Sequence, residues 1–263
     1  MDILETLTEL GGYWGYNGGR YLAKLTSGKV SDTFVNTGVL TCRPKPLANA
    51  VESVLHTQVG SEDIDTFAVR YFDVPNLYVC GPAMGGITLA YEVARQLGGT
   101  AIWFDDAGKP SQPIPKDATV LLVTDRIEHG NRHILTEEFA DYVAQHLGEL
   151  RQILPYILCL VDTSCADIVE VKVKHAVMPE RKAALPLIQG KMLHIIPLAR
   201  LSVLEWDSVK AASEDIGCHT CRKCVGNPDE TCDAPIDMLE AVPVKELIAG
   251  LSDAEFCDKA GGL

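Results

Sequence analysis

The stretch ATVLLVTDRIEHGNRHILTEEFADYV, residues 118–143, decides the fold that the sequence predicts. Its first seven residues are almost continuously apolar, which is typical of a strand that is buried on both faces. The segment DRIEHG then has the composition of a turn, and residues 131–147 carry apolar side chains at helical spacing. A buried strand that turns directly into a helix indicates a repeating unit of a parallel sheet.

The same pattern continues on both sides of this stretch. A helix is expected after Asp2, two short strands around the turn at Ser27–Gly28, and a helix from about Pro44. Further along, the sequence predicts a helix at 87–97 and strands at 76–80, 100–104, 153–162 and 191–198. The expected class is therefore α/β, with a mostly parallel sheet, helices on both faces and ligands beyond the carboxyl ends of the strands.

Composition and charge exclude several classes of function. The chain has 263 residues, 47% of them hydrophobic, which is enough for one large core with a small appendage. A net charge of −13 disfavours binding to nucleic acid or to anionic membranes, so any phosphate site must be built locally. The acidic N-terminus does not resemble a signal peptide, and no apolar run reaches the roughly 18 residues of a membrane span. We expect a cytoplasmic protein.

Polar residues directly after the central strand are candidates for chemistry. A carboxylate at Asp125 can accept hydrogen bonds from two ribose hydroxyls or hold a hydrated Mg²⁺, while the first helical N–H groups point at a phosphate. The candidates beside it are Thr124, Glu128, His129, Gly130, Asn131 and Arg132. The alternative is that Asp125 only forms the turn at the end of the strand.

Three segments, in order along the chain, resemble the orotate phosphoribosyltransferase family. LTSGKVSDTFVNTG (25–38) resembles the hood that covers the base, and VCGPAMGGITLAYEVARQLG (79–98) resembles the strand, diphosphate-binding turn and helix. VLLVTDRIEHGNRHILTEEFADYV (120–143) lies where the family has its phosphoribosyl-diphosphate signature. The resemblance implies a type I phosphoribosyltransferase fold over residues 1–200, with a hood at about 10–40, followed by a Cys-rich extension at 201–263.

The resemblance also implies an activity. It is the transfer of ribose 5-phosphate from phosphoribosyl diphosphate to a nitrogenous base, orotate or another pyrimidine, with Mg²⁺ and release of diphosphate, by a homodimer. Asp125 and Lys29 would be catalytic, and the substrates would contact Ser27, Gly28, Phe34, Gly81, Pro82, Ala83, Met84, Gly85 and Gly86. The alternative is that Phe34 belongs to the core and that Lys29 is a solvated turn residue.

The sequence also departs from the family pattern. The acidic pair of the signature is reduced to Thr124–Asp125, and Thr163 follows Asp162 where the family has an arginine for the carboxylate of orotate. The loop at 105–118, which matches a lysine-rich lid, has only two lysines. A second hypothesis is therefore a catalytically degenerate relative that binds a nucleotide or a partner and regulates.

Four of the nine cysteines are close together in the acidic C-terminal extension. Cys218, Cys221, Cys224 and Cys232 have the spacing C-x2-C-x2-C-x7-C, and four thiolates can enclose a tetrahedral structural Zn²⁺. An iron–sulfur cluster and free or redox-active thiols are the alternatives. Cys80 and Cys159 lie in apolar strand segments and are predicted to be buried thiols.

Overall fold

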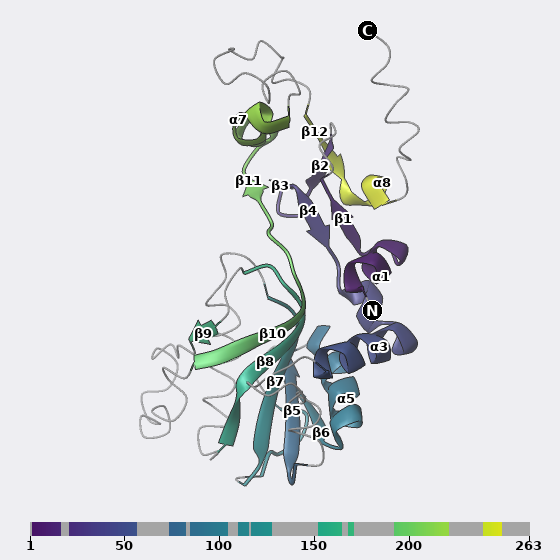
Figure 1. Ribbon diagram of the computed structural model, residues 1–263, viewed down its shortest axis with the longest axis vertical. Helices are drawn as coiled ribbons and strands as arrows, with labels where there is room; N and C mark the ends of the chain where they lie inside the picture. Colours follow the sequence, from purple (N-terminus) through teal and green to yellow (C-terminus); the bar gives the residue numbers. More distant parts are fainter. Residues whose placement is uncertain are drawn as a thin grey trace. The chain divides into compact units, whose positions relative to one another are not determined.

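The chain folds into two compact units in the computed structural model (Figure 1). Unit 1 consists of Met1–Thr6 and Thr37–Ser202, and unit 2 of Leu7–Asn36 and Val203–Leu263. The structure describes residues 2–16, 21–56, 74–82, 85–104, 110–115, 117–127, 152–164, 168–170, 192–220 and 239–248.

Unit 1 is built on a six-stranded sheet with the order β6-β5-β7-β8-β10-β9. The strands β6, β5, β7, β8 and β10 run parallel to one another, and β9 at the edge of the sheet is antiparallel to β10. Their bounds are β5 (Leu77–Pro82), β6 (Thr100–Phe104), β7 (Thr119–Ile127), β8 (Gln152–Asp162), β9 (Ile168–Glu170) and β10 (Met192–Arg200). The predicted α/β class with a mostly parallel sheet is therefore confirmed.

Two helices pack on one face of this sheet. α5 (Gly85–Leu97) packs on β5, β6 and β7, while α3 (Pro44–Leu55) contacts β8 and β10 and packs against α5 (Figure 1). The helix expected at 131–147 lies outside the described residues. No helix in the part of the chain that the structure describes is long and apolar enough to cross a membrane.

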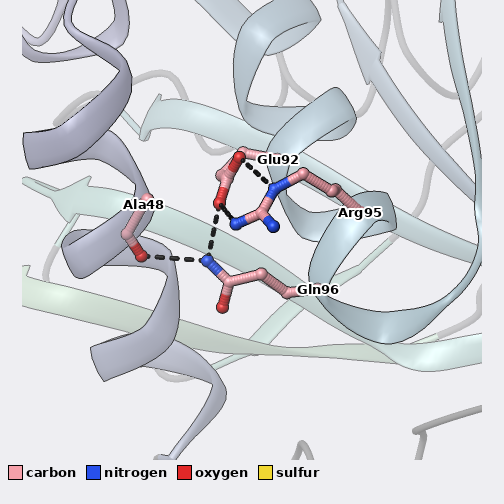
Figure 2. A network of polar contacts seen from close by, with 4 residues as sticks. All are labelled: Ala48, Glu92, Arg95 and Gln96. Atoms are coloured by element: carbon pink, nitrogen blue, oxygen red, sulfur yellow. Dashed lines mark hydrogen bonds and ion pairs between the residues drawn. The ribbon is translucent and has the colours of Figure 1, made fainter.

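A polar network joins the two helices (Figure 2). The guanidinium of Arg95 donates to both carboxylate oxygens of Glu92, at 2.6 and 2.9 Å, and Gln96 Nε2 donates to Glu92 Oε1 at 2.7 Å and to the Ala48 carbonyl at 2.9 Å. Glu92 is 8% exposed, and the hydrogen bonds from Arg95 lower its pKa. This nearly buried charge is compensated by partners within its own helix, and Gln96 extends the network to α3.

Unit 2 contains a four-stranded sheet of order β11-β3-β2-β12 and a pair of antiparallel strands, β1 and β4. The strands are β1 (Tyr13–Gly15), β2 (Tyr21–Lys24), β3 (Val30–Ser31), β4 (Thr33–Val35), β11 (Glu205–Trp206) and β12 (Glu240–Pro243). The helices α7 (Val209–Thr220) and α8 (Val244–Ile248) follow β11 and β12. The two short strands expected around Ser27–Gly28 correspond to β2 and β3.

The core of unit 2 combines residues from both ends of the chain. Leu22 and Val30 from the hood strands pack with Trp206 and Ala212 from the C-terminal segment. The sequence placed the domain boundary at residue 200, and the chain leaves unit 1 at Ser202. The structure nevertheless groups residues 7–36 with the described part of the C-terminal segment, because each supplies apolar side chains that the other covers.

Candidate functional site

Strand β7 carries Asp125 to the carboxyl edge of the unit 1 sheet. Val120, Leu121 and Val123 are fully buried and fix the strand between β5 and β8. The Asp125 carboxylate beyond them is partly exposed, and the hydroxyl of Thr37 donates to its Oδ2 at 2.6 Å. A bond this short is typical of a hydroxyl that donates to an ionised carboxylate.

Gly85, the first residue of α5, lies directly against this carboxylate. A Cβ atom on Gly81 would overlap the carbonyl of Gly86, and a Cβ atom on Gly86 would lie 2.5 Å from Cδ of Pro82. A Cβ atom on Gly85 would overlap the carboxylate of Asp125 itself. The structure therefore brings together Asp125, Gly81, Pro82, Gly85 and Gly86, while Ala83 and Met84 lie outside the described residues.

Thr124 is placed differently from its neighbour. Successive side chains of a strand point to opposite faces, so Thr124 and Asp125 lie on different faces of the sheet. Thr124 is 3% exposed, and its hydroxyl donates to the carbonyl of Arg126 at 3.3 Å. The expected loop residues Glu128, His129, Gly130, Asn131 and Arg132 lie outside the described residues.

An ion pair at the ends of β8 and β10 lies at the same edge of the sheet. The carboxylate of Asp162 is fully buried and accepts from the backbone N–H and the hydroxyl of Ser164, at 2.8 and 2.6 Å. Arg200 Nε lies 3.3 Å from Asp162 Oδ2, and the side chain of Arg200 is 43% exposed. Ile127 pairs with Asp162, which pairs with Arg200, so this ion pair shares a sheet face with Asp125.

Arg200 is not part of the family pattern that the sequence resembles. That pattern has an arginine after Asp162, but Thr163 is fully buried at this position, and its hydroxyl and N–H both donate to the Ile127 carbonyl, at 2.9 and 2.8 Å. Arg200, the last residue of β10, is a cation at this edge of the sheet. The sequence feature that could have identified Arg200 is an arginine at the end of an apolar strand, because parallel strands end at one edge of the sheet.

The hood candidates belong to unit 2. Ser27 and Gly28 form the exposed turn between β2 and β3, where Gly28 has a φ of 87° and its N–H donates to the Leu25 carbonyl at 3.0 Å. A positive φ at this position suits glycine. Phe34 on β4 is partly buried and pairs with Trp14 on β1.

Lys29 follows this turn and makes weak contacts to two carboxylates. Its Nζ lies 3.8 Å from Glu205 and 3.9 Å from Asp207, and about half of the Lys29 side chain is exposed (47%). Ion pairs of this kind contribute little to stability. The side chain of Lys29 can therefore exchange these carboxylates for an anionic ligand at small cost.

The donor set for metals is limited. No group of three or more His, Cys, Asp or Glu in the described ranges could hold a metal ion. A single carboxylate such as Asp125 fits Mg²⁺ when the substrate phosphates supply further oxygen ligands. Cys218 lies in α7, and its side chain, together with Cys221, Cys224 and Cys232, lies outside what the structure describes.

The two predicted strand thiols behave as expected. Cys80 and Cys159 are both buried, and burial raises the pKa of each thiol. Cys42, in contrast, is exposed. The prediction for Cys80 and Cys159 is confirmed, and both are unsuited to act as nucleophiles because the thiolate is strongly disfavoured.

Comparisons with known proteins agree with the sequence segments. No protein-family model matches the chain. The chain is 37% identical over 103 residues to an orotate phosphoribosyltransferase of Thermoanaerobacter sp. (strain X514), covering 39% of this chain and 44% of that relative. It is 32% identical over 136 residues to the enzyme of that name from Caldanaerobacter subterraneus subsp. tengcongensis, covering 49% and 60%. The chain spans about half the length of the curated relatives it matches.

Solved structures give matches under the same name. Orotate phosphoribosyltransferase from Aeropyrum pernix matches with a TM-score of 0.47 at 18% identity, covering 82% of this chain and 98% of that one. The Francisella tularensis protein of that name matches with a TM-score of 0.44 at 14% identity, covering 85% and 94%. The curated relatives by themselves confirm the resemblance to orotate phosphoribosyltransferases that the three sequence segments predicted.

Proposed function

We propose that this chain transfers the ribose 5-phosphate group of phosphoribosyl diphosphate to a nitrogenous base of the orotate or pyrimidine type and releases diphosphate. The observation that carries the proposal is the close approach of the Asp125 carboxylate to Gly85 at the start of α5. This contact places an acceptor for sugar hydroxyls beside the N-terminus of helix α5, at the carboxyl edge of a parallel sheet.

The residues of this edge have complementary roles in the proposal. Asp125 accepts hydrogen bonds from the ribose hydroxyls, and the backbone of the Gly81–Gly86 turn, at the start of the 13-residue helix α5, receives the diphosphate. The loop residues Glu128–Arg132 contact the 5′-phosphate. Mg²⁺ would be held by Asp125 and the diphosphate oxygens, and it would neutralise the charge of the leaving group.

The acceptor in this proposal carries an acidic group. Arg200 lies on the sheet face that also carries Asp125, its side chain is 43% exposed, and its Nε lies 3.3 Å from the buried carboxylate of Asp162. A guanidinium recognises a carboxylate with paired N–H donors, which suits orotate better than uracil. We also propose that Phe34, Ser27, Gly28 and Lys29 contact the base, a role that rests on the resemblance of residues 25–38 to the family's hood.

A catalytically degenerate relative that binds a nucleotide remains the second candidate. The observation in its favour is the position of Thr124, whose hydroxyl is bonded within its own strand and which replaces one acid of the signature. Such a protein would bind phosphoribosyl diphosphate or a nucleotide without turnover.

The test is diphosphate release from phosphoribosyl diphosphate with Mg²⁺, measured across orotate, uracil, the purines and nicotinamide. We expect base-dependent release that falls at least a hundredfold in Asp125→Ala. Asp117→Ala is the matched control, because Asp117 precedes the same strand and contacts Asn76 at its opposite end. Unchanged turnover in Asp125→Ala would refute the role of Asp125, and binding without release would favour the degenerate relative.

Two further parts of the proposal concern the oligomeric state and a structural metal ion. The protein is proposed to be a homodimer, which light scattering of the purified chain tests. The four cysteines of the extension are proposed to hold one structural Zn²⁺. Elemental analysis that finds well under one equivalent of zinc per chain would refute this site.

A further inference from the structure

Thr37 lies immediately before the short helix α2 (Gly38–Thr41) and is 4% exposed. Its backbone carbonyl accepts from the N–H groups of Leu40 and Thr41, so the backbone belongs to the helix start. A threonine at such a position commonly caps the helix with its hydroxyl, but this side chain makes no cap hydrogen bond. The hydroxyl instead donates to Asp125 Oδ2, 88 residues further along the chain.

The Asp125 carboxylate is thus constrained from two directions. Thr37 holds Oδ2 at 2.6 Å, and the backbone of Gly85 lies so close that any side chain there would displace the carboxylate. Rotation about the Cβ–Cγ bond would break the Thr37 bond. One carboxylate oxygen is therefore fixed, and Oδ1 has a defined direction.

We propose that Thr37 is a positioning residue for ribose recognition, and that its hydroxyl does part of the work of the acid that is missing at Thr124. The proposal rests on the proposed function, because it assigns the ribose hydroxyls as the ligand of Asp125. With two acids, each carboxylate limits the orientation of the bound diol. With one acid, a fixed carboxylate achieves a similar restriction, because the conformational freedom that a ligand would otherwise remove is already lost.

Thr37 is too deeply buried to be the ligand's main contact, so its effect passes through Asp125. Thr37→Val keeps the shape of the side chain and removes the donor, whereas Thr37→Ser keeps the donor. Thr41→Val is the matched control, because Thr41 belongs to the same short helix, is also buried, and donates to the Gly38 carbonyl at 3.3 Å.

The experiment measures the Kd of phosphoribosyl diphosphate with Mg²⁺ by calorimetry for the wild type, the three variants, Asp125→Ala and the double variant Thr37→Val/Asp125→Ala. Loss of a hydrogen bond to a charged group predicts a Kd roughly tenfold higher in Thr37→Val, with near wild-type values in Thr37→Ser and Thr41→Val. In the Asp125→Ala background, Thr37→Val should have no further effect, since a positioning residue acts only through its partner.

The outcomes separate this inference from the proposed function. A wild type that binds no phosphoribosyl diphosphate refutes the proposed function and the inference with it. Tight wild-type binding that Thr37→Val leaves unchanged, or that Thr41→Val weakens equally, overturns only the inference. An additive effect in the double variant also overturns it, because Thr37 would then act independently of Asp125.

Discussion

Substituting Gly85 by alanine should impair ligand binding at the candidate site and leave the fold nearly as stable as before. The new Cβ atom would occupy the position of the Asp125 carboxylate, which is the end of a side chain and can rotate away. That rotation breaks the hydrogen bond from Thr37, a loss of about 1.5–3 kcal/mol for a bond to a charged group. Alanine gains up to about 1 kcal/mol over glycine in a helix, and less at the first residue of α5.

The net effect on unfolding should therefore be small, about 1–2 kcal/mol, whereas the effect on ligand binding should be large. The displaced carboxylate no longer faces the bound ribose, so we expect the Kd for phosphoribosyl diphosphate to rise by at least roughly tenfold, which corresponds to about 1.4 kcal/mol. Urea denaturation measures the first quantity and isothermal titration calorimetry the second.

Gly81→Ala is the matched comparison. Its Cβ atom would overlap the backbone carbonyl of Gly86, and a second contact, to Ala90 Cβ at 3.2 Å, limits movement of the helix. Backbone cannot yield as a side chain does, so this variant should lose about 3 kcal/mol of stability or more. A folded Gly85→Ala protein that binds as tightly as the wild type would refute the reasoning, since the carboxylate could then move without consequence.

Three further predictions concern other parts of unit 1. Arg200→Gln should weaken binding of orotate by roughly tenfold and leave uracil unaffected, as competition assays would show; equal losses for both bases would contradict an anion-binding role. Glu92→Gln should cost about 1 kcal/mol at pH 7, a modest figure because the arginine partner is half exposed. The pKa of Glu92 is lowered in the folded state, so this stabilisation is present above the unfolded value near ~4.3 and is lost as the pH falls through the folded value; a difference in urea midpoint that persists unchanged at low pH would contradict it. Iodoacetamide should label Cys42 in the native protein but label Cys80 and Cys159 only after unfolding, and native labelling of either buried thiol, detected by peptide mass spectrometry, would show that its strand opens.

The sheet could be predicted from the sequence because each of its central strands is a short apolar run between turn signals. Residues 118–124 illustrate this well, since Val120, Leu121 and Val123 have no exposed surface in the structure. The strand nevertheless continues to Ile127, past the polar pair that suggested its end. The strand continues because Arg126 and Ile127 pair with Val161 and Asp162 of β8, and backbone pairing does not depend on whether a side chain is apolar.

The grouping of the hood with the C-terminal segment could not be predicted in this way. Leu22 and Trp206 are far apart in the sequence, and neither segment has a periodic apolar face that predicts its partner. Trp206 packs in the core of unit 2 and donates its indole N–H to Asp215 at 2.9 Å. A weakly periodic, acidic segment indicates an appendage when it is considered alone, and its role in completing a core depends on the strands that it covers.

Single residues of the candidate site also could not all be predicted, because some of their contacts join segments that are far apart in the sequence. Sequence order identifies Asp125 and the glycine turn because each is adjacent to its own strand, and strand adjacency then brings them together. Thr37 and Arg200 also lie at this edge of the sheet. Thr37 directly precedes α2, and Arg200 ends β10, which is two positions from β7 in the sheet. A sequence motif specifies residues that are adjacent in the chain, whereas the orientation of a carboxylate depends on residues that are adjacent in space. The missing acid at Thr124 therefore does not by itself predict a lost site, because the hydroxyl that constrains Asp125 lies outside the signature that appeared degenerate.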